Sequence, residues 1–306
     1  MNALRLFLLI CISTLVIACT TTELNHDEEG FFSINGSDIY YKIIGKGEPI
    51  IVIHGGPVLD HSYFLPQFEA LKEDYQLIFY DQRVCGKSGL GMDSSTMNID
   101  GFIDDIALLA DSLGLKDPHI LGHSWGGLLA MKYAIKYPDT HGKLVLSNSM
   151  PPSAQLFQEE SETLATRTTP YDSLRRARLL QSDMMKEFPG ITIQKIMMIA
   201  FKNQFSDTTR RSQLNLTIPH DYMERSQRFF LLGGDISSYN IVEKLASIKR
   251  PTLILYRDTE PAAEITADIF IENIPDVRLE IIPDCGHFPF VEKPEDYFRI
   301  IKEFLK

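Results

Sequence analysis

The first half of the chain alternates between short apolar runs and segments with apolar residues at helical spacing. Residues 50–53 are uniformly apolar, which is typical of a strand buried on both faces of a parallel sheet. Apolar residues recur every three or four positions in 99–113, which predicts an amphipathic helix. Strands that alternate with helices indicate a mostly parallel sheet with helices on both faces. The other expected strands are 31–35 and 39–44, joined by a hairpin turn, then 76–80, 118–121 and 143–147; helical spacing also marks 63–71 and 128–134.

The alternation stops after residue 148. Residues 149–239 are richer in charge and helix-like patterns and hold no convincing strand, so we expect a mostly helical cap inserted in the sheet domain. The alternation then returns, which predicts a core made of 30–148 and 240–306, with the cap before the last two strands. The expected cap helices are 155–164, 173–185, 191–205 and 222–231, and the expected last elements are 252–256, 262–274, 277–282 and 294–305.

The first 19 residues resemble a secretory signal. Arg5 precedes an apolar run at 6–16, which is too short to span a bilayer core of about 30 Å. Residues 16–19, Val-Ile-Ala-Cys, also resemble a bacterial lipobox, so we expect Cys19 to be lipidated. The alternative is a plain signal peptide with an incidental cysteine. The lipobox reading predicts a membrane-anchored lipoprotein of the bacterial cell envelope, with the polar residues 20–29 as a tether.

Composition narrows the expected partners. Of the 306 residues, 44% are hydrophobic and 23% charged, which is ordinary for a globular protein. The formal net charge of −11 argues against nucleic acid or anionic lipid headgroups as main partners. Two of the four cysteines, Cys85 and Cys285, belong to the folded body. We expect both to be unpaired, with a bridge between them as the alternative.

A Gly-x-Ser-x-Gly motif lies where an apolar run passes into a helical pattern. Gly122 and Gly126 flank Ser124 at the spacing of a nucleophile elbow, in which a serine occupies a sharp strand-to-helix turn. Neighbouring chain passes close on both sides of such a turn, so the flanking positions must be nearly free of side chain. The turn exposes the hydroxyl at a helix N-terminus, where partial positive charge favours a developing anion. Ser124 is therefore the expected nucleophile.

A nucleophilic serine needs a base, an acid and an oxyanion hole. His287 follows the last expected strand, at the sheet edge where such folds place their sites, and is the expected base. The acid should follow the preceding strand, where Glu260, directly before a proline, is favoured over Asp258. The backbone N–H groups of Trp125 and Gly56 are the expected oxyanion donors.

Three motifs together resemble the proline iminopeptidases. They are His-Gly-Gly-Pro at 54–57, Asp-Gln-Arg-x-Cys-Gly-Lys-Ser at 81–88 and Gly-x-Ser-Trp-Gly-Gly at 122–127. The resemblance implies an α/β-hydrolase fold and a serine peptidase that removes N-terminal residues, often proline. Two positions depart from the family, because Val58 and Val84 stand where it usually has glycine. We expect these side chains to narrow or reshape the pocket.

The resemblance further implies that cap carboxylates bind the free amino group of the substrate. Asp235 is the first candidate and Glu224 the second, with the acidic residues of 159–162 as further choices. The expected function is an aminopeptidase acting on short peptides, without metal or other cofactor. An esterase, amidase or lactonase acting on small neutral substrates with the same triad is the alternative.

Overall fold

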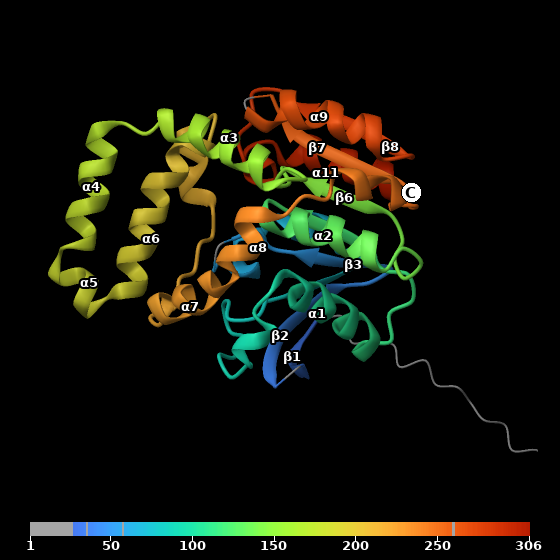
Figure 1. Cartoon of the computed structure of the whole chain (residues 1–306), viewed down its shortest axis with the longest axis horizontal. Coiled ribbons are helices and arrows are strands. Elements are labelled where there is room, and N and C mark those ends of the chain that lie inside the picture. The colour runs from blue at the N-terminus through green and yellow to red at the C-terminus, as the bar shows by residue number, and fades with distance from the viewer. Residues whose placement is uncertain (1–26, 35, 57, 259–260) are drawn as a thin grey trace, which may run out of the picture.

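The computed structural model describes residues 27–306 apart from 35, 57, 259 and 260 (Figure 1). Within this part of the chain, eight strands form one sheet in the order β1-β2-β4-β3-β5-β6-β7-β8. The first two strands are antiparallel and the other six run parallel to one another, as predicted. The strands are β1 (Asp27–Ile34), β2 (Ser37–Gly45), β3 (Glu48–Ile53), β4 (Tyr75–Tyr80), β5 (His119–His123), β6 (Leu144–Ser147), β7 (Thr252–Arg257) and β8 (Val277–Ile282).

Both faces of the sheet are covered. Alternate residues of β3 enter two different hydrophobic clusters, Ile51 and Ile53 on one face and Ile50 and Val52 on the other, and all four are fully buried. This double burial explains the uniformly apolar run. The first cluster holds α1 (Ile99–Ser112), α2 (Trp125–Lys136) and α9 (Pro261–Asn273), and the second holds η2 (Gln67–Leu71) and α11 (Pro294–Leu305).

A helical insertion leaves the sheet after β6 and returns before β7 (Figure 1). Its two ends lie side by side, because Ser153 and Asn240 form an antiparallel bridge. Two backbone hydrogen bonds close this junction, from Ala154 N–H to Tyr239 O at 2.8 Å and from Ile241 N–H to Pro152 O at 2.9 Å. The inserted helices are α3 (Ala154–Thr166), α4 (Pro170–Leu180), α5 (Asp183–Glu187), α6 (Pro189–Ala200), α7 (Tyr222–Phe229) and α8 (Gly233–Ser238).

Several helical segments differ from the sequence prediction. Residues 63–71 belong to two 3₁₀ helices, η1 (His61–Phe64) and η2, because Pro66 lacks an amide hydrogen and holds Leu65 in an extended conformation. Residues 173–185 divide into α4 and α5 at Ser182, which is also extended. The short helix α8 was not expected. No helix among the described residues has the length and apolarity needed to cross a membrane. The predicted signal, Cys19 and most of the tether lie outside these residues.

Candidate active site

Ser124 occupies a strained turn between β5 and α2. Its backbone has φ 56° and ψ −121°, a conformation that non-glycine residues rarely adopt. The flanking glycines are sterically required. A Cβ atom on Gly122 would lie 2.3 Å from the carbonyl oxygen of Gly126, and one on Gly126 would lie 2.2 Å from that of Ile53. Close packing of β3, β5 and α2 therefore forces the serine out toward the edge of the sheet.

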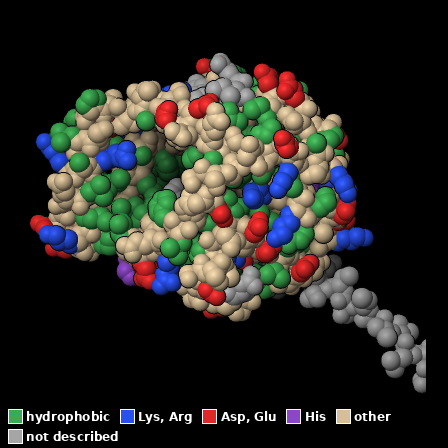
Figure 2. Space-filling model, in the orientation of Figure 1, with side chains coloured by type: hydrophobic (Ala, Val, Ile, Leu, Met, Phe, Trp, Pro, Cys, Tyr) green, Lys and Arg blue, Asp and Glu red, His purple; other side chains and the backbone are tan. Residues whose placement is uncertain are grey.

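A cavity of about 300 Å³ opens in front of this turn. It brings together four residues singled out in the sequence, namely Ser124, His287, Trp125 and Gly56. The insertion supplies most of the apolar wall, and Figure 2 shows the molecule hollowed beside this insertion, with hydrophobic side chains in the hollow. The other lining residues are Asn148, Ser149, Met150, Phe157, Glu160, Ser161, Leu164, Gln204, Phe229, Phe230 and Ile236.

The backbone of His287 is held on both sides. Its N–H group donates to Gln204 O at 2.6 Å. Its carbonyl oxygen accepts from His123 Nε2 at 2.8 Å and from Asn148 Nδ2 at 3.1 Å. Asn148 in turn accepts from the backbone N–H of Arg257, at the end of β7. The loop that carries His287 is thus fixed to β5, to β7 and to the insertion.

A buried relay connects the loop after β3 to this histidine loop. Gly55 N–H donates to Tyr63 Oη at 2.6 Å, and Tyr63 Oη lies 2.9 Å from His123 Nδ1. Because His123 Nε2 must donate to the carbonyl of His287, its Nδ1 accepts the hydroxyl proton of Tyr63. Tyr63 and His123 are each 1% exposed. Sequence reasoning missed both residues, since the partners lie 60 positions apart and no motif joins them.

The loop after β3 is also anchored to the start of α2. The backbone N–H of Gln82 donates to His54 Nε2 at 3.0 Å, and the side-chain Nε2 of Gln82 donates to the backbone carbonyl oxygen of His54 at 2.6 Å. Its Oε1 accepts from Trp125 Nε1 at 2.9 Å. Burial lowers the pKa of His54 to about 4, so the ring is neutral. The Gly55 amide is bonded to Tyr63, which favours Gly56 as the loop donor to an oxyanion.

Of the two candidates for the acid of the triad, the structure describes only Asp258. Asp258 is exposed, and its carboxylate accepts the backbone N–H of Asp284 at 3.0 Å, a contact that joins the loop after β7 to the turn after β8. Glu260 lies outside the described residues. The preference for Glu260 over Asp258 stays a prediction.

Asp235 and Glu224, the two carboxylates expected to bind the substrate amino group, are not among the residues that line the cavity. Asp235 accepts the backbone N–H of Ile99 at 2.8 Å and so caps the start of α1. Glu224 pairs with Arg228 at 2.9 Å. Neither residue lines the cavity, whereas Glu160 does and is the one carboxylate among its described lining residues. Of α8, only Ile236 is among the described lining residues, whereas α3 contributes four of them, so the structure favours Glu160 over the first choices.

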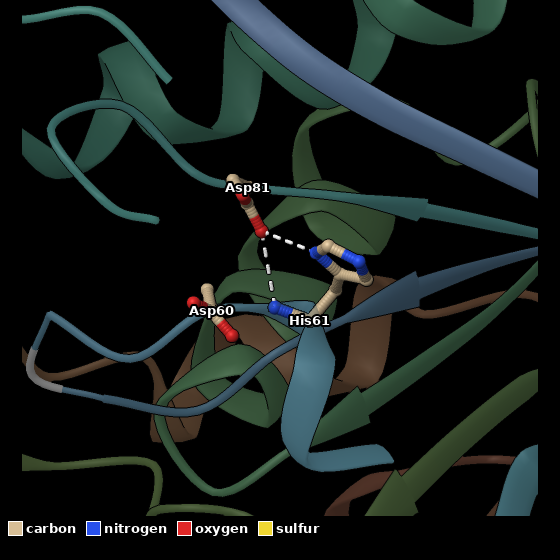
Figure 3. A group of neighbouring side chains, drawn as sticks. All are labelled: Asp60, His61 and Asp81. Carbon is tan, nitrogen blue, oxygen red and sulfur yellow. Dashed lines mark hydrogen bonds and ion pairs between the residues drawn. The ribbon is translucent and has the colours of Figure 1, made fainter. Parts of the chain in front are cut away.

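Asp60, His61 and Asp81 form a buried cluster whose potential ligand atoms lie within 4.8 Å of one another (Figure 3). Asp81 Oδ1 accepts from the backbone N–H of His61 at 3.0 Å and from its Nδ1 at 2.7 Å, and Oδ2 accepts from Lys87 N–H at 2.8 Å. Burial, together with the charge of Asp81, raises the pKa of Asp60. Protein donors already use both oxygens of Asp81, so we interpret the cluster as an anchor for the loop after β4.

Val58 and Val84 adopt the backbone conformation that glycine favours. Their φ angles are 53° and 58°, in the left-handed region where a β-branched residue is an outlier. Both side chains are buried in the cluster that holds α1 and α2, and neither lines the cavity. The expectation that these valines narrow the pocket is therefore wrong. Their effect is on backbone strain in the two loops, since the side chains point into the core.

Cys85 and Cys285 are both buried, and neither forms a disulfide. The structure agrees with the expected absence of a bridge between them. Burial raises the pKa of each thiol, to about 12 for Cys285, so neither is a reactive thiolate near neutral pH.

A profile described as the alpha/beta hydrolase fold matches residues 48–294, which is most of the chain. The chain belongs to the alpha/beta hydrolase fold family. It is 27% identical over 286 residues to a proline iminopeptidase of Clostridioides difficile (strain 630), covering 90% of this chain and 97% of that protein. It is 28% identical to a proline iminopeptidase of Saccharolobus solfataricus, covering 91% and 92%.

Solved structures share this fold. The crystal structure of proline iminopeptidase from Mycobacterium smegmatis superposes with a TM-score of 0.66 at 21% identity, covering 91% of this chain and 97% of that one. An esterase from Exiguobacterium antarcticum superposes with a TM-score of 0.67 at 21% identity, covering 91% and 99%. Two differently named hydrolases are thus about equally similar in structure, so the likeness shows the fold and not the substrate.

Proposed function

We propose that this hydrolase is an aminopeptidase that releases N-terminal residues from short peptides through a serine nucleophile. The observation that carries the proposal is a carboxylate, Glu160, which lies among the mostly apolar described residues that line the cavity of Ser124 and His287. The proline iminopeptidases that cover nearly the whole chain add support.

The proposed chemistry uses the elbow and the histidine loop. His287 removes the proton of the Ser124 hydroxyl as it attacks the scissile carbonyl, and the Trp125 and Gly56 N–H groups stabilise the oxyanion. The same histidine then protonates the leaving amine. Water, deprotonated by His287, hydrolyses the acyl-enzyme and restores the serine. In this proposal Glu260 orients the imidazole and stabilises its cation.

Glu160 would select substrates with a free amino group. A charge-assisted contact between a carboxylate and an ammonium group is stronger than a contact between neutral groups, above all beside apolar side chains that exclude water. An N-acetylated substrate offers no charge for this contact. The apolar side chains around Glu160 fit an uncharged side chain on the first residue of the peptide.

The test compares aminoacyl and N-acetyl-aminoacyl p-nitroanilides that differ only in the acetyl group. We expect acetylation to lower kcat/KM by about 100-fold or more, which corresponds to a charge-assisted contact of about 3 kcal/mol. Glu160→Gln should bring the two substrates to within about tenfold of each other. Glu162→Gln is the matched control, because Glu162 lies on the same helix, is exposed and bonds Gln158. A free-to-acetylated ratio near one in the unmodified protein would remove the aminopeptidase proposal.

The apolar character of the cavity favours one alternative, an esterase or amidase acting on small neutral acyl groups. Phe157, Leu164, Phe229, Phe230 and Ile236 would then hold the acyl chain. Under this alternative, p-nitrophenyl esters of uncharged acids are turned over faster than any free aminoacyl anilide, and Glu160→Gln leaves that rate unchanged.

We also propose that Cys19 carries a lipid anchor, on the strength of the lipobox-like residues 16–19. Metabolic labelling with a palmitate analogue should mark the protein, and Cys19→Ser should abolish the label. Equal labelling of both forms would contradict the proposal and favour a plain signal peptide.

A further inference from the structure

One part of the insertion differs in charge from the rest of the protein. We call residues 170–213 the arm; it comprises α4, α5, α6, η4 (Phe201–Gln204) and η5 (Thr208–Gln213), and its helices α4, α5 and α6 project to one side of the molecule (Figure 1). The arm contains eight Lys and Arg residues and four Asp and Glu residues, a net charge of +4 in a chain of −11. The charge of the whole chain therefore conceals a basic region.

A groove of about 540 Å³ runs along this arm. Arg175 and Arg178 of α4 are three positions apart, and Met198 of α6 follows Lys195 by three positions and Gln194 by four, so each helix presents one face to the groove. The remaining lining residues are Leu179, Ile199 and Arg211. Two helices and η5 thus bring four cationic side chains to one groove with an apolar floor.

None of these four cations forms an ion pair within the part of the chain that the structure describes. Asp172 is a nearby acidic influence, since the charge of Arg175 helps to lower the pKa of that carboxyl. Neighbouring cations of the arm do have partners, as Lys202 bonds Asp172 at 3.0 Å. Like charges gathered in one groove repel one another, and an anionic surface would relieve that repulsion.

Large apolar side chains are exposed on the same helices. Asp172 is the only buried residue of α4, and three large apolar residues of this helix, Tyr171, Leu174 and Leu180, are exposed to solvent. Figure 2 shows green and blue side chains together over the arm. The exposed apolar residues are Tyr171 at 66%, Leu174 at 48%, Leu180 at 51%, Phe188 at 52% and Ile191 at 52%. Basic residues interleaved with exposed apolar ones are typical of surfaces that lie in the interface of an anionic bilayer.

We infer that the arm docks on an anionic phospholipid surface, with the four cations on headgroup phosphates and the apolar side chains at the level of the glycerol and upper acyl groups. Neither free phosphate nor a nucleic acid backbone offers an apolar layer, so either would leave the exposed apolar residues in water. The inference is separate from the proposed hydrolysis and from the proposed anchor at Cys19, neither of which involves these residues.

The experiment measures partitioning of the full-length protein onto vesicles of phosphatidylcholine with and without 30% phosphatidylglycerol, by flotation at about 0.1 M salt. Any insertion through the N-terminal segment acts on both vesicle types, so the ratio of the two partition coefficients isolates the contribution of charge. We expect this ratio to be about 100 or more, since each cation near an anionic surface contributes roughly fivefold. The quadruple variant R175Q/R178Q/K195Q/R211Q should bring it close to one.

Two further variants make the result decisive. K46Q/K116Q/K244Q/K306Q removes four exposed cations outside the arm and changes the net charge equally, so it should keep the high ratio. The variant Y171S/L174S/I191S should lower partitioning onto anionic vesicles by about tenfold or more. A ratio near one in the unmodified protein, or equal losses in the two charge variants, would overturn the inference. Full partitioning of the serine variant would also overturn it, because the surface would then recognise anionic charge alone.

Discussion

His123 Nε2 donates a hydrogen bond to the backbone carbonyl of His287 at 2.8 Å, and the two rings lie 4.8 Å apart. The residue directly before the proposed nucleophile thus supports the residue proposed as its base. Because Tyr63 lies on the other side of His123 and also bonds Gly55, this contact connects the proposed oxyanion loop, the elbow and the histidine loop. A disturbance in any one of them should reach the other two.

Replacing Tyr63 with phenylalanine tests this connection. The variant leaves the buried Gly55 N–H and His123 Nδ1 without a partner, at a cost of about 1–3 kcal/mol. We expect the free energy of unfolding to fall by that amount and kcat to fall by about tenfold, with KM changed less than twofold. Tyr133→Phe is the control, since Tyr133 is equally buried but bonds Thr140, away from the cavity. An equal loss of kcat in both variants would mean that the relay only stabilises the fold.

Replacing Ser124 with alanine should abolish turnover and leave the fold intact. Loss of a catalytic serine typically lowers kcat by about 10⁴–10⁶-fold. Steady-state hydrolysis and labelling by a fluorophosphonate probe measure the effect. Ser161→Ala removes another hydroxyl from the cavity wall and should retain label and activity. Labelling that persists in the alanine variant at 124 would rule out this residue as the nucleophile.

The two acidic candidates should respond differently to amide substitution. Asp258→Asn keeps an oxygen that can accept the Asp284 N–H, so we expect activity within a few-fold of the unmodified protein. Glu260→Gln should lower kcat by about 10⁴-fold if this residue stabilises the imidazolium. Comparison of kcat for the two variants decides the assignment, and the reverse order would assign the acid to Asp258.

Low pH should destabilise the folded protein, partly through protonation of His54 in the unfolded chain. Burial lowers its pKa to about 4, whereas an unfolded histidine titrates near 6.5. Between these values the unfolded chain binds a proton that the folded chain does not, so the free energy of unfolding falls as the pH falls, by about 3 kcal/mol in total. Urea titrations from pH 7 to 4 should show a shallower loss for His54→Gln. Identical slopes in the unmodified protein and the variant would refute the prediction.

Val84→Gly should cost less stability than a buried valine normally does. The substitution removes a fully buried side chain, but it also relieves the strain of a backbone at φ 58°. This left-handed conformation costs an L-residue about 1–2 kcal/mol. Val145 is equally buried in β6 and serves as the comparison. We expect Val84→Gly to be at least about 1 kcal/mol less destabilising than Val145→Gly in denaturant titrations. Equal losses would show that the conformation at 84 carries no strain.

Local patterns in the sequence predicted the sheet and the elbow well, because uniform apolar runs and a Gly-x-Ser-x-Gly motif depend on neighbours in the chain. These local patterns gave wrong predictions where a side chain bonds a residue far away in the sequence. Asp235 was expected at the substrate, but its carboxylate caps a helix 136 positions earlier. Val58 and Val84 were correctly noted as departures, yet their burial in the core depends on which way each loop turns, and the sequence does not encode that in a short pattern.

The junction of the insertion has a consequence for how such a protein can diversify. Pro152, Ser153, Tyr239, Asn240 and Ile241 clamp the two ends of the insertion together by backbone hydrogen bonds, which do not depend on side-chain identity. Residues 154–238 therefore form an inserted segment whose two ends lie next to each other. Another helical segment could be joined at the same clamp without moving β6 or β7. Substrate range and surface preference can therefore change by exchange of the insertion, provided that the new segment also supplies an acceptor for the His287 N–H, as Gln204 does here.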